Sequence, residues 1–72
     1  MTHLQWFLDK SEDYVKTRIW EAKSYNFCGL DEVMGCYQAY YMVVVGFGVC
    51  HKVTVTQKEF HGDELEIVVE TM

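Results

Sequence analysis

The stretch that decides the fold is residues 38–50, QAYYMVVVGFGVC, in which three consecutive valines lie between two tyrosines and a Gly-Phe-Gly sequence. No charged residue occurs between Glu32 and Lys52. An uncharged run of this length raises the question of a membrane span. Glutamine, tyrosine and glycine interrupt it, however, and no second apolar segment flanks it. β-Branched residues bounded by glycine are typical of β-strands, so we predict strands here and no membrane segment.

Two segments further along the chain, residues 53–58 and 64–70, alternate apolar with polar side chains, which is the pattern of half-buried strands. Residues that face each other across a hairpin share a face of the sheet, so the two apolar sets meet only if Val55 pairs with Ile67. This register predicts a short loop, Phe60-His61-Gly62, with glycine in the left-handed position. It also pairs Val53 with Val69, Gln57 with Leu65, Lys58 with Glu64 and Lys52 with Glu70.

The same loop rule, applied to Gly46-Phe47-Gly48, adds a preceding strand. It pairs Val45 with Val49, Val43 with His51 and Tyr41 with Val53. The predicted core face carries Ala39, Tyr41, Val43, Val45, Val49, His51, Val53, Val55, Leu65, Ile67 and Val69. The opposite face carries Tyr40, Met42, Val44 and Cys50 at one edge and passes to Lys52, Thr54, Thr56, Glu66 and Glu70 toward the other. The first strand is therefore predicted to be an edge strand that is apolar on both faces.

The N-terminal segment is predicted to be the helix that covers the core face. Its apolar residues recur at helical spacing: Leu4, Phe7, Leu8, Val15, Ile19 and Ala22. Thr2 followed by Gln5 resembles a capping box, so we place the helix over residues 3–23. Ser11 followed by two acidic residues is an alternative start for a second helix after a break. For residues 25–38 the sequence allows two predictions: a short helix from Asp31 to Tyr37, or an extension of the first strand by part of this segment.

The predicted fold is a single α+β domain, residues 1–72, with an N-terminal helix packed on a three-stranded antiparallel β-meander. A net charge of −5 disfavours direct nucleic-acid binding, because contacts with phosphates need clustered Lys and Arg. Three cysteines do not complete a disulfide framework, and the chain does not begin with the pattern of a signal peptide. We therefore expect a reduced, cytoplasmic protein that does not associate with membranes.

The residues capable of chemistry do not form a catalytic or metal-binding pattern. Cys50 and His51 are neighbours on a predicted strand, so their side chains point to opposite faces and cannot act together. The spacing of Cys28, Cys36 and Cys50 does not fit a zinc site, and we predict three small buried side chains. His51 is predicted to be a hydrogen-bonded core residue and His61 a solvated turn residue. We expect no enzyme activity, no metal and no cofactor.

The leading functional hypothesis is a small binding protein, an inhibitor or adaptor that docks on a host macromolecule, of the kind that phages and mobile elements encode. A protein partner is expected. The predicted contact surface is the apolar edge of Tyr40, Met42, Val44 and Cys50, because an edge strand without charge or proline normally needs a cover. A homodimer is one way to cover it, and folding of residues 25–38 back over the edge is the alternative.

Two other functions compete with this hypothesis. Glu64, Glu66 and Glu70 could form a carboxylate row that imitates a nucleic-acid backbone and blocks the basic groove of a DNA- or RNA-binding enzyme. The predicted register sets lysines beside two of these glutamates, which favours an ordinary solvated face. A small metal-binding or redox protein is the third hypothesis.

Overall fold

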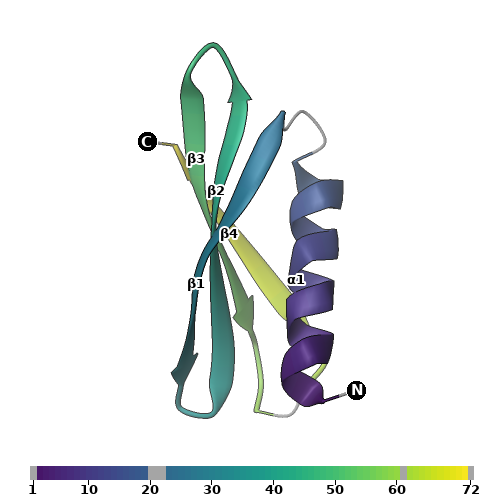
Figure 1. Cartoon of the computed structure of the whole chain (residues 1–72). Coiled ribbons are helices and arrows are strands. Elements are labelled where there is room, and N and C mark those ends of the chain that lie inside the picture. Colours follow the sequence, from purple (N-terminus) through teal and green to yellow (C-terminus); the bar gives the residue numbers. More distant parts are fainter. Residues whose placement is uncertain (1, 20–22, 61, 72) are drawn as a thin grey trace.

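A computed structural model of the chain describes residues 2–19, 23–60 and 62–71. It contains one helix followed by a meander of four antiparallel strands in the order β1-β2-β3-β4 (Figure 1). The elements are α1 (His3–Arg18), β1 (Ser24–Val33), β2 (Cys36–Gly46), β3 (Val49–Gln57) and β4 (Leu65–Thr71). The α+β class is confirmed, but the prediction of three strands is wrong, because the structure has four.

Helix α1 is continuous and shorter than predicted. Thr2 caps its start, with its hydroxyl accepting a hydrogen bond from the Gln5 amide at 3.1 Å. A break at Ser11 is ruled out because this residue is fully buried in mid-helix, where its hydroxyl donates to the Phe7 carbonyl oxygen at 2.8 Å. The helix ends at Arg18 instead of residue 23, and Ala22 lies outside the described residues.

The fourth strand comes from the segment for which the sequence favoured no single structure. Residues 25–33 extend along β2 as part of β1, and residues 36–38 begin β2. Of the two alternatives for this segment, the helix from Asp31 to Tyr37 is therefore wrong, and the extension of the first strand is confirmed for residues 36–38. Met34 and Gly35 form the turn between the strands, with φ of 52° and 80°. Positive φ at both central residues is the pattern of a type I′ hairpin turn, whose twist matches that of the flanking strands. β2 is therefore an inner strand and not the predicted edge strand.

The hairpin of β2 and β3 keeps the predicted register with one change near the turn. Val43 pairs with His51 and Tyr41 with Val53, as predicted. The predicted pair of Val45 with Val49 is wrong, because Gly46 faces Val49 and a bulge at Val45 absorbs the extra residue. The turn is only Phe47-Gly48, again with positive φ at both residues.

The register of β3 and β4 is confirmed for every strand pair that was predicted. Val55 faces Ile67, and the pairs Val53 with Val69, Gln57 with Leu65 and Lys52 with Glu70 are also present. Lys58 and Glu64 lie beyond the strand ends but remain joined by a backbone hydrogen bond of 3.0 Å and an ion pair of 3.8 Å. Regular pairing stops at Gln57 and Leu65, so the loop is longer than predicted, and His61 lies outside the described residues.

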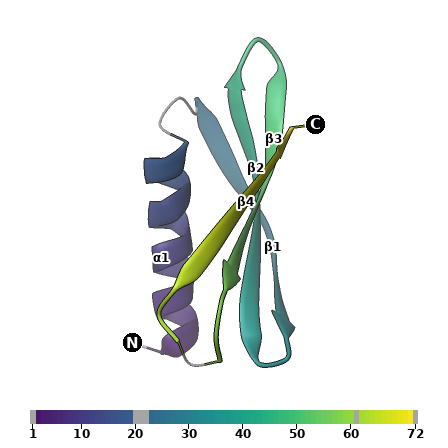
Figure 2. The same ribbon diagram turned by 180° about the vertical axis from the view of Figure 1, so that it is seen from behind.

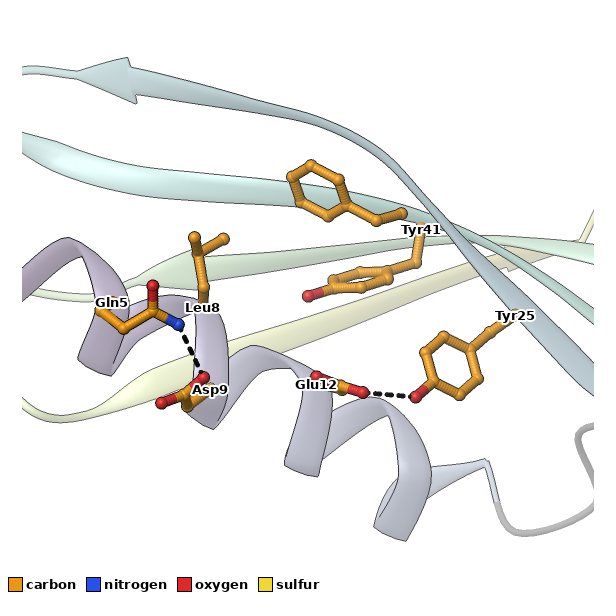
Figure 3. Close-up of a pocket in the computed structure, with 7 residues that line it drawn as sticks. Gln5, Leu8, Asp9, Glu12, Tyr25 and Tyr41 are labelled. Carbon is orange, nitrogen blue, oxygen red and sulfur yellow. Dashed lines mark hydrogen bonds between the residues drawn. The ribbon is translucent and has the colours of Figure 1, made fainter.

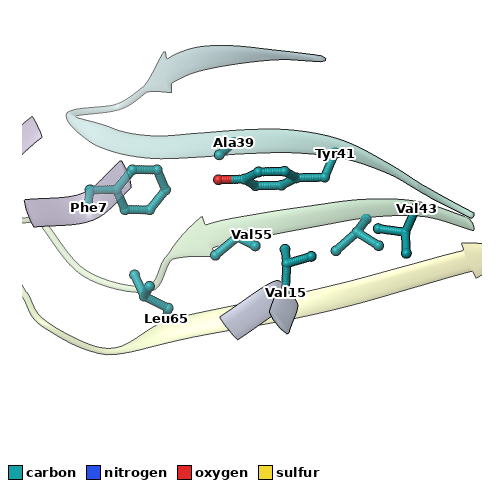
Figure 4. Close-up of a cluster of buried hydrophobic side chains, with 8 residues drawn as sticks. Phe7, Val15, Ala39, Tyr41, Val43, Val55 and Leu65 are labelled. Carbon is teal, nitrogen blue, oxygen red and sulfur yellow. The ribbon is translucent and has the colours of Figure 1, made fainter. Parts of the chain in front are cut away.

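The core lies between α1 and one face of the sheet. Phe7 and Val15 point from the helix toward the strands (Figure 4), and the buried apolar residues from the sheet are Ala39, Tyr41, Val43, Val53, Val55 and Leu65. All six belong to the predicted core face. Val49 and Val69 were also predicted there, but they remain 41% and 46% exposed because α1 lies closest to the central part of β2 and β3.

The strands twist strongly, and the hairpin of β2 and β3 extends past the C-terminal end of α1 (Figures 1 and 2). The turn of β1 and β2 lies at the opposite end of the sheet, near the N-terminus of the helix. Within the part of the chain that the structure describes, no helix has the length and apolar character needed to cross a membrane. The uncharged run from residue 33 to residue 50 is used for strands instead.

Gln57 joins three parts of the structure although its side chain is only 2% exposed. Its Oε1 accepts a hydrogen bond from the Tyr37 amide at 3.2 Å, and its Nε2 donates to the Gly62 carbonyl oxygen at 2.9 Å. The same Nε2 lies 2.8 Å from Nε2 of His3 at the start of α1. A buried amide with partners on both ends stabilises the fold, whereas its removal leaves those partners unsatisfied.

Gln57→Leu is expected to lower the free energy of unfolding by about 2 kcal/mol, because it keeps the side-chain volume and deletes these hydrogen bonds. Urea denaturation followed by circular dichroism measures the change. Gln5→Leu is the control, since Gln5 is an exposed glutamine of α1 and its replacement should change stability by less than about 0.5 kcal/mol. Equal stability of Gln57→Leu and the parent protein would contradict a structural role for the buried amide.

Phe47→Asn is expected to raise the free energy of unfolding by about 0.5–1 kcal/mol. Phe47 has φ of 49°, and its side chain gains nothing from burial because it is fully exposed at the hairpin tip. Asparagine tolerates the left-handed conformation, whereas alanine does not. Thermal unfolding should therefore show a higher midpoint for Phe47→Asn and no increase for Phe47→Ala; equal gains for both variants would indicate a cause other than backbone conformation.

Candidate functional site

The sheet face opposite α1 is a surface that no described element covers. We call it the open face. It is formed by alternate residues of all four strands. These residues are Ser24, Asn26, Gly29, Asp31 and Val33 of β1, Cys36, Gln38, Tyr40, Met42 and Val44 of β2, Cys50, Lys52, Thr54 and Thr56 of β3, and Glu66, Val68 and Glu70 of β4.

All four residues of the predicted contact surface lie on the open face. Tyr40, Met42 and Val44 follow one another along β2, and Cys50 of β3 faces Val44. Each is half-buried by its neighbours within the sheet. The structure therefore brings these residues together as an apolar stripe, but it moves the stripe from the edge of the sheet to its interior.

Strand β1 flanks the stripe without covering it. Asn26 pairs with Met42, and Ser24 pairs with Val44. The alternative considered from the sequence, that residues 25–38 fold back over the predicted edge, is confirmed for residues 25–33, because they pair along β2 as part of β1. β1 satisfies the backbone hydrogen bonds along one side of β2, but its side chains lie beside the stripe in the same layer.

Polar side chains lie on both sides of the stripe, and two of them form hydrogen bonds with the hydroxyl of Tyr40, the aromatic residue of the stripe. The Tyr40 hydroxyl lies 3.0 Å from a carboxylate oxygen of Asp31 and 2.9 Å from the side-chain oxygen of Gln38. The hydrogen bond with the Asp31 carboxylate raises the pKa of Tyr40 above its usual value. On the other side of the stripe, Lys52 of β3 pairs with Met42. The open face thus has an apolar stripe with polar side chains on both sides, and Val33 and Val68 add exposed apolar surface elsewhere on the same face.

The three glutamates proposed as a nucleic-acid mimic do not form one uninterrupted row. Glu66 faces Thr56 and Glu70 faces Lys52 across the sheet. Glu64 precedes β4 and forms an ion pair with Lys58 at 3.8 Å. Two of the three carboxylates therefore have a lysine next to them, which reduces their resemblance to a phosphate backbone.

The hairpin tips carry exposed apolar residues that the sequence analysis did not identify as candidates. Met34 is 95% exposed and Phe47 is fully exposed, and the two lie at opposite ends of the sheet. Both adopt positive φ, which is unusual for a bulky side chain. The signal in the sequence was a large apolar residue directly before a turn glycine. The two tips add apolar surface at both ends of the molecule.

The cysteines and His51 do not assemble into a reactive site. All three thiols are free, and the prediction that they are buried is wrong: Cys28 is exposed at a bulge of β1, and Cys36 and Cys50 are half-buried. Nδ1 of His51 lies 3.3 Å from the Thr71 hydroxyl, on the face away from Cys50. Among the described residues, no three His, Cys, Asp or Glu side chains lie close enough to hold a metal ion.

A second surface feature lies on the helix side of the sheet, between α1 and β1. It is a groove of about 280 Å³, which we call the α1–β1 groove. Figure 3 shows Leu8, Asp9 and Glu12 on the helix opposite Tyr25 and Tyr41 on the strands. Gln5 and Phe27 complete its lining. The sequence analysis missed it, although the alternation of Tyr25 and Phe27 and the carboxylates of Asp9 and Glu12 were visible.

Hydrogen bonding and burial change the titration of the groove residues. The Tyr25 hydroxyl donates to Oε1 of Glu12 at 2.6 Å, and Nζ of Lys16 lies 3.3 Å from the same oxygen. The hydrogen bond from Tyr25 lowers the pKa of Glu12, with Lys16 acting in the same direction, and it raises the pKa of Tyr25. Burial, supported by the negative charge of Glu12, raises the pKa of Tyr41 to about 12.

Comparison of the chain with models of protein families, with curated proteins and with solved structures finds no match. The candidate sites therefore rest on their own geometry. The open face offers apolar contact across a broad surface, and the α1–β1 groove offers aromatic rings together with carboxylates in a small space.

The raised pKa of Tyr41 predicts a loss of stability in alkali. In the unfolded chain this tyrosine ionises near pH 10.0, whereas in the folded protein it keeps its proton up to about pH 12. The folded state then binds more protons than the unfolded state, so the free energy of unfolding falls as the pH rises through this window, by about 2–3 kcal/mol in total.

Urea denaturation at a series of pH values between neutrality and pH 12 measures this loss. Tyr41→Phe should show a flatter decline than the parent protein. Tyr25→Phe is the comparison, because its hydroxyl lies nearer the surface and should account for less of the decline. An identical decline in the parent protein and Tyr41→Phe would show that Tyr41 does not hold its proton as described.

Proposed function

We propose that this protein is a small non-enzymatic binding protein, an inhibitor or adaptor, that docks on another protein through its open face. The observation that carries the proposal is the apolar stripe of Tyr40, Met42, Val44 and Cys50, which lies in the middle of a sheet face that no described element covers. Contiguous apolar surface with a polar surround is characteristic of protein interaction sites.

The chemistry of the open face supports a protein as the partner. Tyrosine and methionine are enriched at the centres of protein interfaces, and Tyr40 and Met42 occupy the centre here. Asp31, Lys52 and Glu70 lie around them as a mixed-charge rim. A rim of both signs gives a partner orientation without the strong single-sign field that binding to nucleic acid or imitation of it requires.

The geometry also supports a binding role without catalysis. An open sheet face contacts a partner's side chains over a broad area but does not enclose a reacting group. The thiol within the stripe, that of Cys50, lies within hydrogen-bonding distance of the Gly48 carbonyl oxygen at 3.8 Å, and His51 points to the other face. A protein of this kind acts by occupying a surface of its partner, which is what an inhibitor or an adaptor does. A second copy of the chain is one possible protein partner.

Met42→Lys is expected to abolish partner binding or self-association while the protein stays folded. The lysine would stand beside Lys52 on an uncovered face, so the isolated protein should lose no more than about 1 kcal/mol of stability. In a complex, the same charge would be buried without a counter-ion, which costs several kcal/mol. Affinity capture from the native host identifies the partner, and titration with the purified partner then measures the affinity; sedimentation measures self-association.

Thr56→Lys is the matched control, because it adds the same charge to the polar part of the open face, opposite Glu66. It should bind nearly as well as the parent protein. Met42→Glu, with its carboxylate facing Lys52, replaces Met42→Lys if the lysine variant is unstable. Unchanged affinity and oligomeric state in a folded Met42 variant would refute docking through the stripe. Affinity that falls steeply with salt and depends on Glu64, Glu66 and Glu70 would support the nucleic-acid mimic instead.

A further inference from the structure

We propose that the α1–β1 groove binds the guanidinium group of an arginine side chain presented by a protein partner. This site lies on the helix side of the sheet and is separate from the open face. The inference therefore does not depend on docking through the apolar stripe, and the two can be tested independently.

The groove exists because one helix cannot cover four strands. A helix with its side chains is about 10–12 Å wide, whereas the outer strands of a four-stranded sheet are separated by roughly 14 Å. Helix α1 lies closest to β2 and β3, so β1 is left partly uncovered on the helix side. Phe27 of β1 consequently remains 53% exposed although its face of the sheet is the core face.

Three aromatic rings line the uncovered strip. Tyr41 is buried at the base of the groove, and its ring centroid lies 5.6 Å from that of Phe27 and 6.4 Å from that of Tyr25. The Tyr41 ring meets the Phe27 ring at 71° and the Tyr25 ring at 63°, so the three rings are not stacked on one another. The face of an aromatic ring carries negative electrostatic potential and attracts cations.

The opposite wall adds negative charge. Asp9 and Glu12 of α1 both line the groove; Figure 3 shows the Glu12 carboxylate directed at Tyr25 and the Asp9 carboxylate next to the Gln5 side chain. Glu12 already forms an ion pair with Lys16 at 3.3 Å. Asp9 accepts a hydrogen bond from the neutral Gln5 amide at 3.0 Å, and no ion pair with it is present among the described residues. Asp9 is therefore the carboxylate available to an incoming cation.

The chain's own Lys16 illustrates this chemistry at one end of the groove. Its Nζ lies 6.0 Å from the centroid of the Tyr25 ring while it contacts Glu12. One cation is thus already held jointly by an aromatic ring and a carboxylate. The remaining part of the groove repeats the combination with Phe27, Tyr41 and Asp9, where no lysine or arginine of the described chain makes an ion pair.

An arginine side chain fits this site better than the other cations of proteins. The volume of about 280 Å³ is suited to a single side chain rather than to a helix or strand. The guanidinium group is planar, stacks on aromatic rings and can donate two parallel hydrogen bonds to one carboxylate. An ammonium group is more strongly hydrated and loses more on entering a groove lined by Leu8 and Phe27.

The test is a titration of the isotope-labelled protein with Nα-acetyl-arginine methylamide, followed by NMR. Saturable shifts of the Tyr25, Phe27 and Tyr41 ring signals are expected, with a dissociation constant in the millimolar range. The corresponding citrulline derivative has nearly the same shape without the charge and should bind at least fivefold more weakly. Equal binding of both ligands, or no saturable shift, would overturn the proposal.

Arginine binding by single-residue variants shows whether the ligand occupies the groove or is attracted only by the net negative charge of the protein. Asp9→Asn and Phe27→Leu should each weaken arginine binding at least threefold, since the first removes the free carboxylate and the second a ring. Asp13→Asn removes one negative charge from the exposed side of the same helix and should leave binding unchanged. Equal effects of Asp9→Asn and Asp13→Asn would show nonspecific attraction to an acidic protein and would overturn the site.

Two further measurements distinguish this site from a free amino-acid site and from the open face. Free L-arginine should bind no better than the blocked derivative; binding more than tenfold tighter would indicate a site for a free amino acid and would overturn the assignment to a protein side chain. Met42→Lys should leave the titration unchanged, because Met42 lies on the other face of the sheet. Loss of the ring shifts in that variant would show that the groove is not an independent site.

Discussion

The structure depends on the packing of one 16-residue helix against a sheet of four strands. Phe7, Ser11 and Val15 are spaced four residues apart and are all fully buried, so they form the centre of the helix face that meets the sheet. Ser11 is small and bonds to the helix's own backbone, which brings α1 close to the strands without leaving a buried polar group unsatisfied. The residues beside this centre, Trp6, Tyr14 and Ile19, also pack against the core but remain partly exposed.

Two surfaces of different chemistry follow from this arrangement. On the far side of the sheet, alternate residues of β2 and β3 leave an apolar stripe framed by polar side chains. On the near side, the strip of β1 that α1 does not reach becomes a groove in which aromatic rings face carboxylates. The first surface suits apolar contact over a broad area, and the second suits a single cationic group. Strand β1 separates the two, so one partner that wraps around this strand could contact both.

Two residues in the hairpin turns adopt a backbone conformation that destabilises the fold, and their side chains make too few contacts to offset this. Met34 and Phe47 adopt a left-handed backbone in which a bulky residue is disfavoured by about 1 kcal/mol, yet their side chains remain almost entirely in solvent. Gly35 serves a different purpose, because a side chain there would collide with the ring of Phe60 at 2.5 Å. The two turns therefore leave bulky apolar side chains exposed at both ends of the sheet.

The sequence by itself determined the pairing of β2 with β3, except next to their turn, the pairing of β3 with β4, and the division of their residues between two faces. Side chains alternate along a strand, and cross-strand charges and turn glycines select one register, so the pairs of Val55 with Ile67 and Tyr41 with Val53 could be predicted. Only the tertiary structure decided what lies beside and above those strands. Residues 25–33 carry weak local signals and become β1 because β2 offers an unpaired edge, which turned the predicted edge stripe into an interior one. The α1–β1 groove could not be predicted from the sequence either. It is lined by residues as far apart in the chain as Asp9 and Tyr41, and it depends on where a narrow helix packs on a wider sheet. No local sequence pattern specifies that position.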